Sequence, residues 1–283
     1  GKFDDVINSG TTELDPEKLT KILSGLLSPI DQKGRYLHWD KLQYLESPEG
    51  MPNEEWWFRQ KMARRSKYKI LPFKGKKQKE FVYCPLDSIY KILHEIDQQA
   101  AGNITIQDTS SIIDEKTRNR DIVNSLIEEA INSSQLEGAA TTRVKAIEMI
   151  RNERKARDES EQMILNNFHT MQFIKTIKKE KLTEKIILKL QSMLTEGTFD
   201  KPEKVGRFRR EDEDVNVEDQ YGEVLHYPPD AGLIPEYISQ ICHFANYVDS
   251  EVFVHPVLKG VILHFMLAYV HPFVDGNGRT ARA

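Results

Sequence analysis

Cysteine, long apolar runs and metal-ligand clusters are scarce in this chain, and each scarcity excludes a class of protein. The 283 residues include only two cysteines, Cys84 and Cys242, which is too few for a disulfide framework. We expect both to be buried thiols in a reducing compartment. No group of Cys and His has the spacing of a zinc site. No apolar run approaches the roughly 20 residues of a membrane-spanning helix, and no secretory signal opens the chain. We therefore expect a cytoplasmic protein without membrane contact.

Charge is abundant but almost balanced. The chain has 40 Lys and Arg against 44 Asp and Glu, a formal net charge of -4, so there is no overall basic character of the kind that binds nucleic acid. Residues 59–79 are a local exception, with ten Lys and Arg and no acid. They could contact nucleic acid or an acidic partner, or they could be a solvated helix followed by a turn. We favour the second interpretation and leave nucleic-acid binding open.

Helical spacing of apolar residues predicts a mainly α protein in two parts. Residues 1–15 are polar and expected to be poorly ordered. A helix starting at Asp15-Pro16-Glu17 would open an N-terminal α-rich domain over residues 16–103, and a second helical domain would span 104–283. Residues 70–71 and 81–83 are expected to pair as a short hairpin.

The residues from Pro256 to Val270 are apolar nearly all round, which predicts a buried central helix with His264 packed in the core. A further helix begins at Asn277 and has only about one turn before the last residue. An isolated turn is a poor end for a domain, so we expect the natural protein to continue beyond Ala283. Gly1 in place of Met likewise leaves the natural start undefined.

The densest chemistry lies in residues 271–282, which read His-Pro-Phe-Val-Asp-Gly-Asn-Gly-Arg-Thr-Ala-Arg. A histidine can accept a proton near neutral pH, and a carboxylate can hold a hard cation such as Mg²⁺. Glycines allow backbone N–H groups to surround an anion at a helix start. Two arginines three residues apart share a helix face and can reach phosphate oxygens. This set of groups is suited to binding a polyphosphate and transferring part of it.

The same run resembles the motif of the Fic (filamentation induced by cAMP) family, His-x-Phe-x-Asp/Glu-Gly-Asn-Gly-Arg-x-x-Arg, at every fixed position. The matching residues are His271, Phe273, Asp275, Gly276, Asn277, Gly278, Arg279 and Arg282. A surface turn between two helices would explain any two of these features, but not all eight together. The resemblance implies a Fic-type helical bundle that transfers AMP from ATP to a protein hydroxyl.

The resemblance also implies a role for each residue of the motif. His271 would be the general base for the target hydroxyl, and Asp275 would be the Mg²⁺ ligand. Residues 276–278 would form an anion hole around the α- and β-phosphates. Arg279 would contact the inner phosphates and Arg282 the γ-phosphate. Phe273 would fix the loop to the core.

A second segment, Ser133-Ser134-Gln135-Leu136-Glu137-Gly138, resembles the inhibitory motif of the same family, Ser/Thr-x-x-x-Glu-Gly/Asn. Its fixed residues are Ser133, Glu137 and Gly138, on a helix expected near residues 121–138. The resemblance implies that Glu137 pairs with Arg282 and withholds it from ATP. A helix end with a Gly cap would give the same short pattern, but its position upstream of the catalytic motif favours the inhibitory interpretation.

A third segment, near residues 206–229, contains Val215-Asn216-Val217, a Gly-containing turn and His226 before a Pro-Pro pair. This pattern predicts a short hairpin, and the resemblance implies the flap that docks the target's backbone by strand addition. An ordinary exposed hairpin is the alternative. The segment is also acidic, which could favour a basic target but is equally explained by solvation; its acids are Glu211, Asp212, Glu213, Asp214, Glu218, Asp219 and Glu223.

The resemblance therefore predicts a protein adenylyltransferase that uses ATP and Mg²⁺, acts on a Ser, Thr or Tyr hydroxyl of a target protein, and is autoinhibited by Glu137. Transfer of another phosphate-containing group, or removal of AMP, would use the same residues. A nucleotide-sensing regulatory or DNA-binding module is a third alternative. The sequence leaves open whether the protein forms a homodimer.

Overall fold

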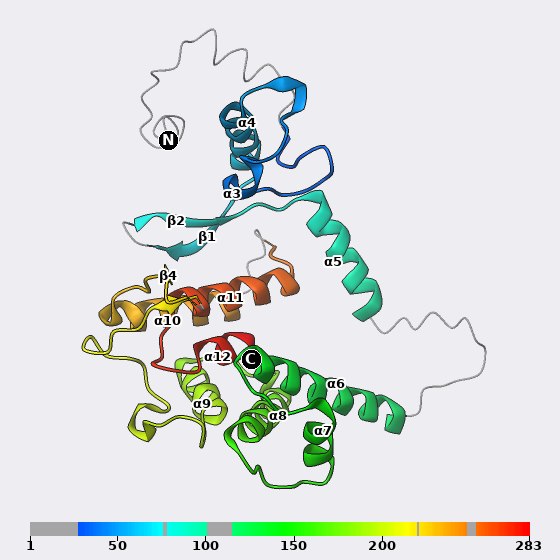
Figure 1. The fold of residues 1–283 in the computed structure, drawn as a ribbon, viewed down its shortest axis with the longest axis vertical. Helices are drawn as coiled ribbons and strands as arrows, with labels where there is room; N and C mark the ends of the chain where they lie inside the picture. The colour runs from blue at the N-terminus through cyan, green and yellow to red at the C-terminus, as the bar shows by residue number, and fades with distance from the viewer. Residues whose placement is uncertain (1–27, 76–77, 101–114, 220, 248–252) are drawn as a thin grey trace, which may run out of the picture. The chain divides into compact units, whose positions relative to one another are not determined.

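A computed structural model describes residues 28–75, 78–100, 115–219, 221–247 and 253–283 (Figure 1). The chain divides into two compact units, Gly1–Ile104 and Thr105–Ala283. Helices dominate the described part of both units, which confirms the expected mainly α class. The expectations for residues 1–15 and for a helix start at residues 15–17 lie outside the described residues.

The N-terminal unit combines short helices with a two-stranded sheet. Its elements are α3 (Trp39–Leu42), a 3₁₀ turn (Pro48–Gly50), α4 (Asn53–Arg65), β1 (Lys69–Lys74), β2 (Glu80–Tyr83) and α5 (Asp87–Ala100). The strands are antiparallel, with Ile70 opposite Val82, so the expected hairpin is confirmed. Leu37, Leu42 of α3 and Trp56 of α4 form a small buried cluster.

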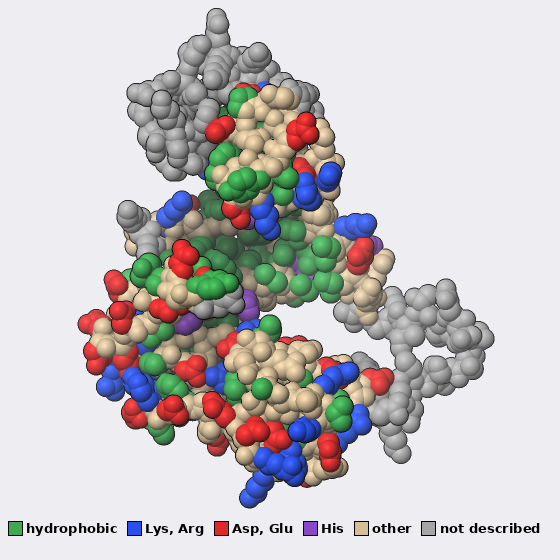
Figure 2. Space-filling view, in the orientation of Figure 1, with side chains coloured by type: hydrophobic (Ala, Val, Ile, Leu, Met, Phe, Trp, Pro, Cys, Tyr) green, Lys and Arg blue, Asp and Glu red, His purple; other side chains and the backbone are tan. Residues whose placement is uncertain are grey.

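The basic segment 59–79 is divided between internal contacts and solvent. Arg64 is only 2 % exposed; its guanidinium lies 3.7 Å from the ring centre of Tyr36 and donates a hydrogen bond to the Pro29 carbonyl. Arg59 pairs with Glu55 one helical turn away. On the face of this unit shown in Figure 2, Lys and Arg side chains stand in separate groups. The helix α4 is as expected, but the expected turn at residues 72–76 is wrong for residues 72–74, which belong to strand β1.

The C-terminal unit is a helical bundle with one small hairpin. Its elements are α6 (Glu115–Leu136), α7 (Arg143–Arg151), α8 (Glu159–Ile177), α9 (Glu184–Leu194), β3 (Val217–Glu218), β4 (Val224–His226), α10 (Ile234–Asn246), α11 (Pro256–Val270) and α12 (Asn277–Arg282). Side-chain caps fix two helix starts: the Asp158 carboxylate accepts the N–H of Glu161 at 2.8 Å, and the Thr183 hydroxyl accepts that of Ile186 at 3.3 Å. Such caps satisfy amide groups that have no acceptor within the helix.

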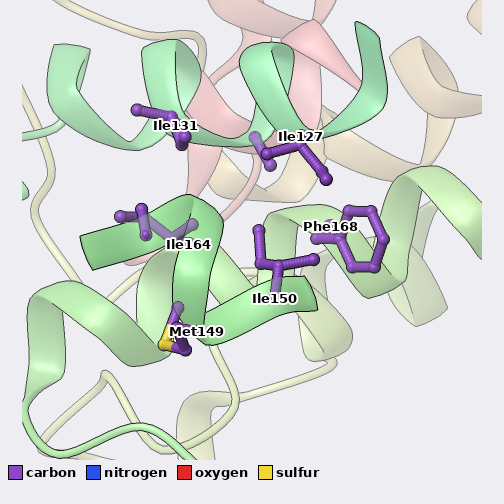
Figure 3. Close-up of a cluster of buried hydrophobic side chains, with 8 residues drawn as sticks. Ile127, Ile131, Met149, Ile150, Ile164 and Phe168 are labelled. Atoms are coloured by element: carbon purple, nitrogen blue, oxygen red, sulfur yellow. The ribbon is translucent and has the colours of Figure 1, made fainter. Parts of the chain in front are cut away.

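A buried cluster fixes α6 against α7 and α8 (Figure 3). Its labelled members are Ile127 and Ile131 from α6, Met149 and Ile150 from α7, and Ile164 and Phe168 from α8. Truncating one such buried isoleucine to Ala typically costs about 2–5 kcal/mol. The packing matters for the site because α6 ends immediately before Glu137.

Helix α11 has the expected bounds, but the expectation that it is buried all round is wrong. Ile262, Met266 and Val270 face the core, whereas Val261 and Phe265 are 59 % and 50 % exposed. His264 is also exposed, although its Nδ1 lies 2.8 Å from the Ala281 carbonyl oxygen. Apolar residues on every face show that a helix could be buried on every side. They do not show which faces other helices pack against.

The two cysteines are partly buried free thiols, and burial raises the pKa of both Cys84 and Cys242. They are thus less enclosed than the sequence suggested. Within the described ranges, every helix is too short or too polar to cross a membrane.

Candidate active site

The motif of residues 271–282 lies where helices from distant parts of the C-terminal unit meet. His271 follows the last residue of α11, residues 272–276 form a loop, and α12 carries the rest. Helix α12 contacts α6, α9 and α11, and Figure 1 shows it beside the C-terminal end of α6. The fold therefore gathers the motif and the end of α6 into one place.

His271 caps α11 in an unusual backbone conformation. Its φ and ψ are +48° and +59°, in the left-handed region, where a non-glycine residue stores roughly 1–3 kcal/mol of strain. A following proline, here Pro272, disfavours helical conformations of the preceding residue. The His271 N–H still donates to the Leu267 carbonyl at 3.0 Å, so the helix is closed before the chain turns away. Strain of this kind is often found at functional sites.

The surroundings of His271 favour its neutral form. Burial lowers the pKa of the imidazole below its ordinary value of 6.5, a hydrogen bond with the backbone of Ala268 opposes this, and the positive charge of Arg209 and the proximity of His226 lower it further. The Glu137 carboxylate acts weakly in the opposite direction. A neutral imidazole is the form that can accept a proton.

We expect the His271 ring to titrate below pH 6.5 in the folded protein. The unfolded chain then binds the proton more readily, so this group's contribution to stability is present above pH 6.5 and is lost as pH falls through the folded pKa. NMR titration of the ring signals would measure the pKa, with the His271 resonance assigned by its absence from His271→Ala. A midpoint above 6.5 would contradict the described burial.

Internal hydrogen bonds and an aromatic contact hold the loop at residues 272–276. Phe273 is fully buried, and its ring centre lies 5.5 Å from that of Phe208. The Asn277 side chain accepts the Phe273 N–H at 2.9 Å and donates to the Phe273 carbonyl at 2.7 Å. The amide of Asn277 is thus committed to the loop, which leaves its backbone N–H for the predicted anion hole.

The two glycines are required by different neighbours. Gly276, at φ +79°, caps α12, and a Cβ there would come within 2.7 Å of the Thr195 methyl carbon. A Cβ on Gly278 would come within 2.5 Å of a Glu137 carboxylate oxygen. The start of α12 therefore lies directly against an acidic side chain. The first amides of a helix attract anions.

Asp275 and Arg279 form a pair beside this helix start. The Arg279 Nη2 donates to the Asp275 Oδ2 at 2.7 Å, while its Nη1 donates to the Leu194 carbonyl and the Thr198 hydroxyl. Arg279 is 4 % exposed and the Asp275 side chain 39 % exposed. In this structure Arg279 holds Asp275 in place, and its predicted contact with the inner phosphates stays a prediction.

The donor set at Asp275 fits magnesium bound largely through a nucleotide. The described residues contain no group of three or more His, Cys, Asp or Glu side chains that could bind a metal ion by themselves. Mg²⁺ commonly binds through one or two carboxylates together with substrate phosphates and water. A single partly exposed carboxylate, oriented by an arginine, suits that kind of binding. Asp275 as the ligand remains a prediction.

Arg282 forms hydrogen bonds with the end of α6 and with Glu137, the residue that follows it. Its Nη2 lies 2.5 Å from the Glu137 Oε1 and 3.3 Å from the Ser133 carbonyl, and its Nε donates to the Ser133 hydroxyl at 2.9 Å. Gly138 follows at φ +95° and ends the segment. The structure thus brings Arg282 to Ser133 and Glu137, which precede it by 149 and 145 residues in the chain.

The hairpin at residues 206–229 is present but shorter than its sequence pattern. Val217 pairs with His226, whereas Val215 and Asn216 precede the strand. The His226 Nε2 lies 2.8 Å from the Tyr269 carbonyl oxygen, and the two rings are 5.1 Å apart. His226 therefore attaches β4 to α11. Target docking by these four flap residues is not tested by the geometry.

One acid of the hairpin region is not part of an open acidic surface. Glu213, with its side chain 10 % exposed, forms ion pairs with Arg207 at 2.8 Å and Lys204 at 2.7 Å. Hydrogen bonds from Arg207, and next from Lys204, hold its pKa far below the usual range. The sequence interpretation missed these partners because they precede the acidic stretch.

Sequence reasoning also missed two polar residues that hold the loop. Gln191 is fully buried; its amide donates to the Asp275 carbonyl at 3.2 Å and accepts the Gly206 N–H at 2.6 Å. Arg209 donates from Nε to the His271 carbonyl at 2.9 Å. Gln191 lies on the apolar face of α9 beside Ile187, Leu190 and Leu194, and a polar residue on such a face was the only signal in the sequence. It did not identify a partner.

Part of the chain is similar in sequence to known proteins. Residues 181–283 match the model of the Fic/DOC family. A curated relative, the protein adenylyltransferase Fic of Drosophila virilis, is 35 % identical over 106 residues, which cover 38 % of this chain and 20 % of that protein. The matched segment thus spans only a fifth of that relative's length.

Two solved structures have a similar fold. A Fic family protein from Desulfovibrio desulfuricans aligns with a TM-score of 0.54 and 19 % identity, over 71 % of this chain and 56 % of that one. A Fic domain containing signaling protein from Bacteroides thetaiotaomicron aligns with a TM-score of 0.52 and 23 % identity, over 68 % of each chain. At these identities the likeness concerns the fold alone. The family match and the curated relatives assign residues 181–283 to the Fic/DOC family.

Proposed function

We propose that this protein is an adenylyltransferase that moves AMP from ATP to a Ser, Thr or Tyr hydroxyl of a target protein. One observation carries the proposal: His271, whose pKa is lowered by burial, and the first turn of α12 lie at the two ends of one short loop. A base and an anion-binding helix start are therefore presented together. The Fic relatives named protein adenylyltransferases support this choice of reaction.

In the proposed reaction, His271 takes the proton from the target hydroxyl as the oxygen attacks the α-phosphorus. A new oxygen–phosphorus bond forms, and the bond between the α-phosphorus and pyrophosphate breaks. Phosphoryl-type transfers depend mainly on positioning and on neutralising charge. The backbone of residues 276–278 and the guanidinium of Arg282 would neutralise phosphate charge here. Asp275 would hold Mg²⁺, which supplies further positive charge when bound.

The proposed restraint is competition for Arg282. Its guanidinium already has charge-assisted hydrogen bonds from the end of α6, and the Glu137 carboxylate lies against Gly278. A γ-phosphate would need the same donors, and its negative charge would be repelled by the carboxylate. ATP would then bind only in an unproductive arrangement while Glu137 stays in place.

The hairpin would receive the target backbone by strand addition. Its two short strands are held to α11 through His226, which places the hairpin near His271. The target's chemistry beyond a hydroxyl side chain is not proposed.

Replacing Asp275 with Asn should raise the Mg²⁺ concentration needed for half-maximal transfer, by about 10- to 100-fold or more, since even outer-shell partners of metals contribute that much affinity. Mg²⁺ titrations of the transfer rate would measure the shift, with Asp200→Asn as a control for charge loss at another exposed acid. Equal half-saturation in the Asp275 variant and the unmodified protein would contradict the ligand assignment.

The proposed reaction is tested by mass spectrometry of proteins incubated with ATP, Mg²⁺ and the Glu137→Gly variant. The expected product is a peptide carrying AMP on a Ser, Thr or Tyr side chain, absent when His271→Ala is added to the same variant. A different phosphate-containing adduct would indicate another donor chemistry.

A further inference from the structure

We propose that Arg209 is a positioning residue that couples the hairpin to His271 and sets the conformation of that histidine. The inference rests on the proposed function. Arg209 lies at the entrance of the hairpin region, 62 residues before His271 in the chain. Its guanidinium donates hydrogen bonds to backbone carbonyls, and the carboxylates of Asp214 and Asp230 act on its charge.

The contacts of Arg209 converge on the strained turn at the end of α11. Its Nε donates to the His271 carbonyl at 2.9 Å, and its backbone N–H donates to the Pro272 carbonyl at 2.9 Å. Its Nη2 lies 3.5 Å from the Val270 carbonyl oxygen. The guanidinium thus faces the Val270 and His271 carbonyls at the helix C-terminus, where unpaired carbonyls and the helix dipole favour positive charge.

The same side chain also closes the far end of the hairpin region. The Arg209 Nη2 donates to the Pro229 carbonyl at 2.5 Å. The guanidinium of Arg209 therefore links the two ends of the hairpin segment 206–229 to each other and to His271. Arg209 is 8 % exposed. Burial lowers the pKa of the Arg209 guanidinium, and the negative charges of Asp214 and Asp230 partly oppose this. A buried guanidinium is costly unless its donors are satisfied, which is consistent with a residue retained for this geometry.

Segment 206–209 runs alongside the catalytic loop, which supports the coupling. Gly206 is linked through Gln191 to Asp275, Phe208 packs on Phe273, and Arg209 binds residues 270–272. Residue numbers fall along one segment as they rise along the other, so the two are antiparallel. A movement of segment 206–209, which leads into the hairpin, would therefore be transmitted to His271.

A lysine at position 209 keeps the charge but cannot reach the His271 and Pro229 carbonyls together, because it lacks the guanidinium's planar fork. In a Glu137→Gly background, we expect Arg209→Lys and Arg209→Gln to lower kcat for the protein target by about 10- to 100-fold through misplacement of His271. We expect KM for ATP to change little. Arg210→Gln, the same charge loss at the exposed neighbouring arginine, should leave kcat unchanged.

Two further readouts separate positioning from general destabilisation. NMR titration should show the His271 pKa moved upward in Arg209→Gln, where the nearby positive charge is lost, with less movement in Arg209→Lys. Hydrogen exchange should show faster exchange at amides of β3 and β4 in both variants and no change at α8. Wild-type kcat in the well-folded Arg209→Lys protein would overturn the inference.

Failure of the proposed function has a different signature. If the Glu137→Gly protein with Arg209 intact transfers no AMP, the reaction assignment fails. The inference is then decided by the titration and exchange measurements alone, and it is wrong if both match the unmodified protein.

Discussion

Replacing His271 with Ala in the Glu137→Gly protein should lower AMP transfer by about 10²- to 10⁴-fold, the usual contribution of a general base. Burial lowers the pKa of the imidazole, which favours the neutral form that accepts a proton, and in the proposed site no other side chain is assigned to accept the hydroxyl proton. ATP affinity should change little because other groups are assigned to the phosphates. Transfer rates and ATP binding by calorimetry would be measured together.

The matched control for this variant is His169→Ala. His169 is an exposed histidine on α8, so its removal tests the loss of an imidazole away from the loop and should leave transfer unchanged. Retention of most activity by His271→Ala would show that another group accepts the proton. A loss of ATP affinity equal to the loss of rate would show instead that the loop had lost its shape.

Replacing Glu137 with Gly should raise AMP transfer by roughly 10-fold or more. Hydrogen bonds to charged groups contribute about 1.5–3 kcal/mol, and the Glu137–Arg282 contact at 2.5 Å must be broken before Arg282 can reach a γ-phosphate. Glu137 lies just beyond α6, so glycine there interrupts no helix. Initial rates with saturating ATP would measure the effect.

Three variants define the origin of that increase. Glu137→Gln keeps the side chain's size and removes its charge, so it should give much of the increase. Glu129→Gln, at an exposed position on the same helix, should give none. Adding Arg282→Ala to Glu137→Gly should remove the gain. Equal rates for Glu137→Gly and a demonstrably active unmodified protein would sink the inhibitory role.

Local pattern was enough to predict much of the fold. Helix α11 begins at Pro256, which fits the first turn of a helix, and its apolar run ends at Val270 as the sequence indicated. The hairpin that pairs Ile70 with Val82 was also predicted, because residues with a high β-strand propensity lie on either side of a turn. These elements depend on interactions between residues close in the chain, so a short window of sequence contains their signal.

Contacts between distant segments were not available from pattern. The exposure of Val261 and Phe265 depends on which helices pack around α11, and hydropathy does not contain that information. The pairing of Glu137 with Arg282 was expected from a family resemblance alone. The contact between Arg209 and His271 was not foreseen, because an arginine in a charged stretch looks like a solvated residue until the fold buries it.

The most direct test of the account is to compare label transfer from ATP labelled on the α-phosphate with transfer from ATP labelled on the γ-phosphate. A host lysate would be incubated with the full-length protein, alongside its Glu137→Gly and His271→Ala variants. The account predicts protein-bound label from the α position only, strongest with Glu137→Gly and absent with His271→Ala. Protein-bound label from the γ position only would contradict it, since phosphate rather than AMP would then be transferred.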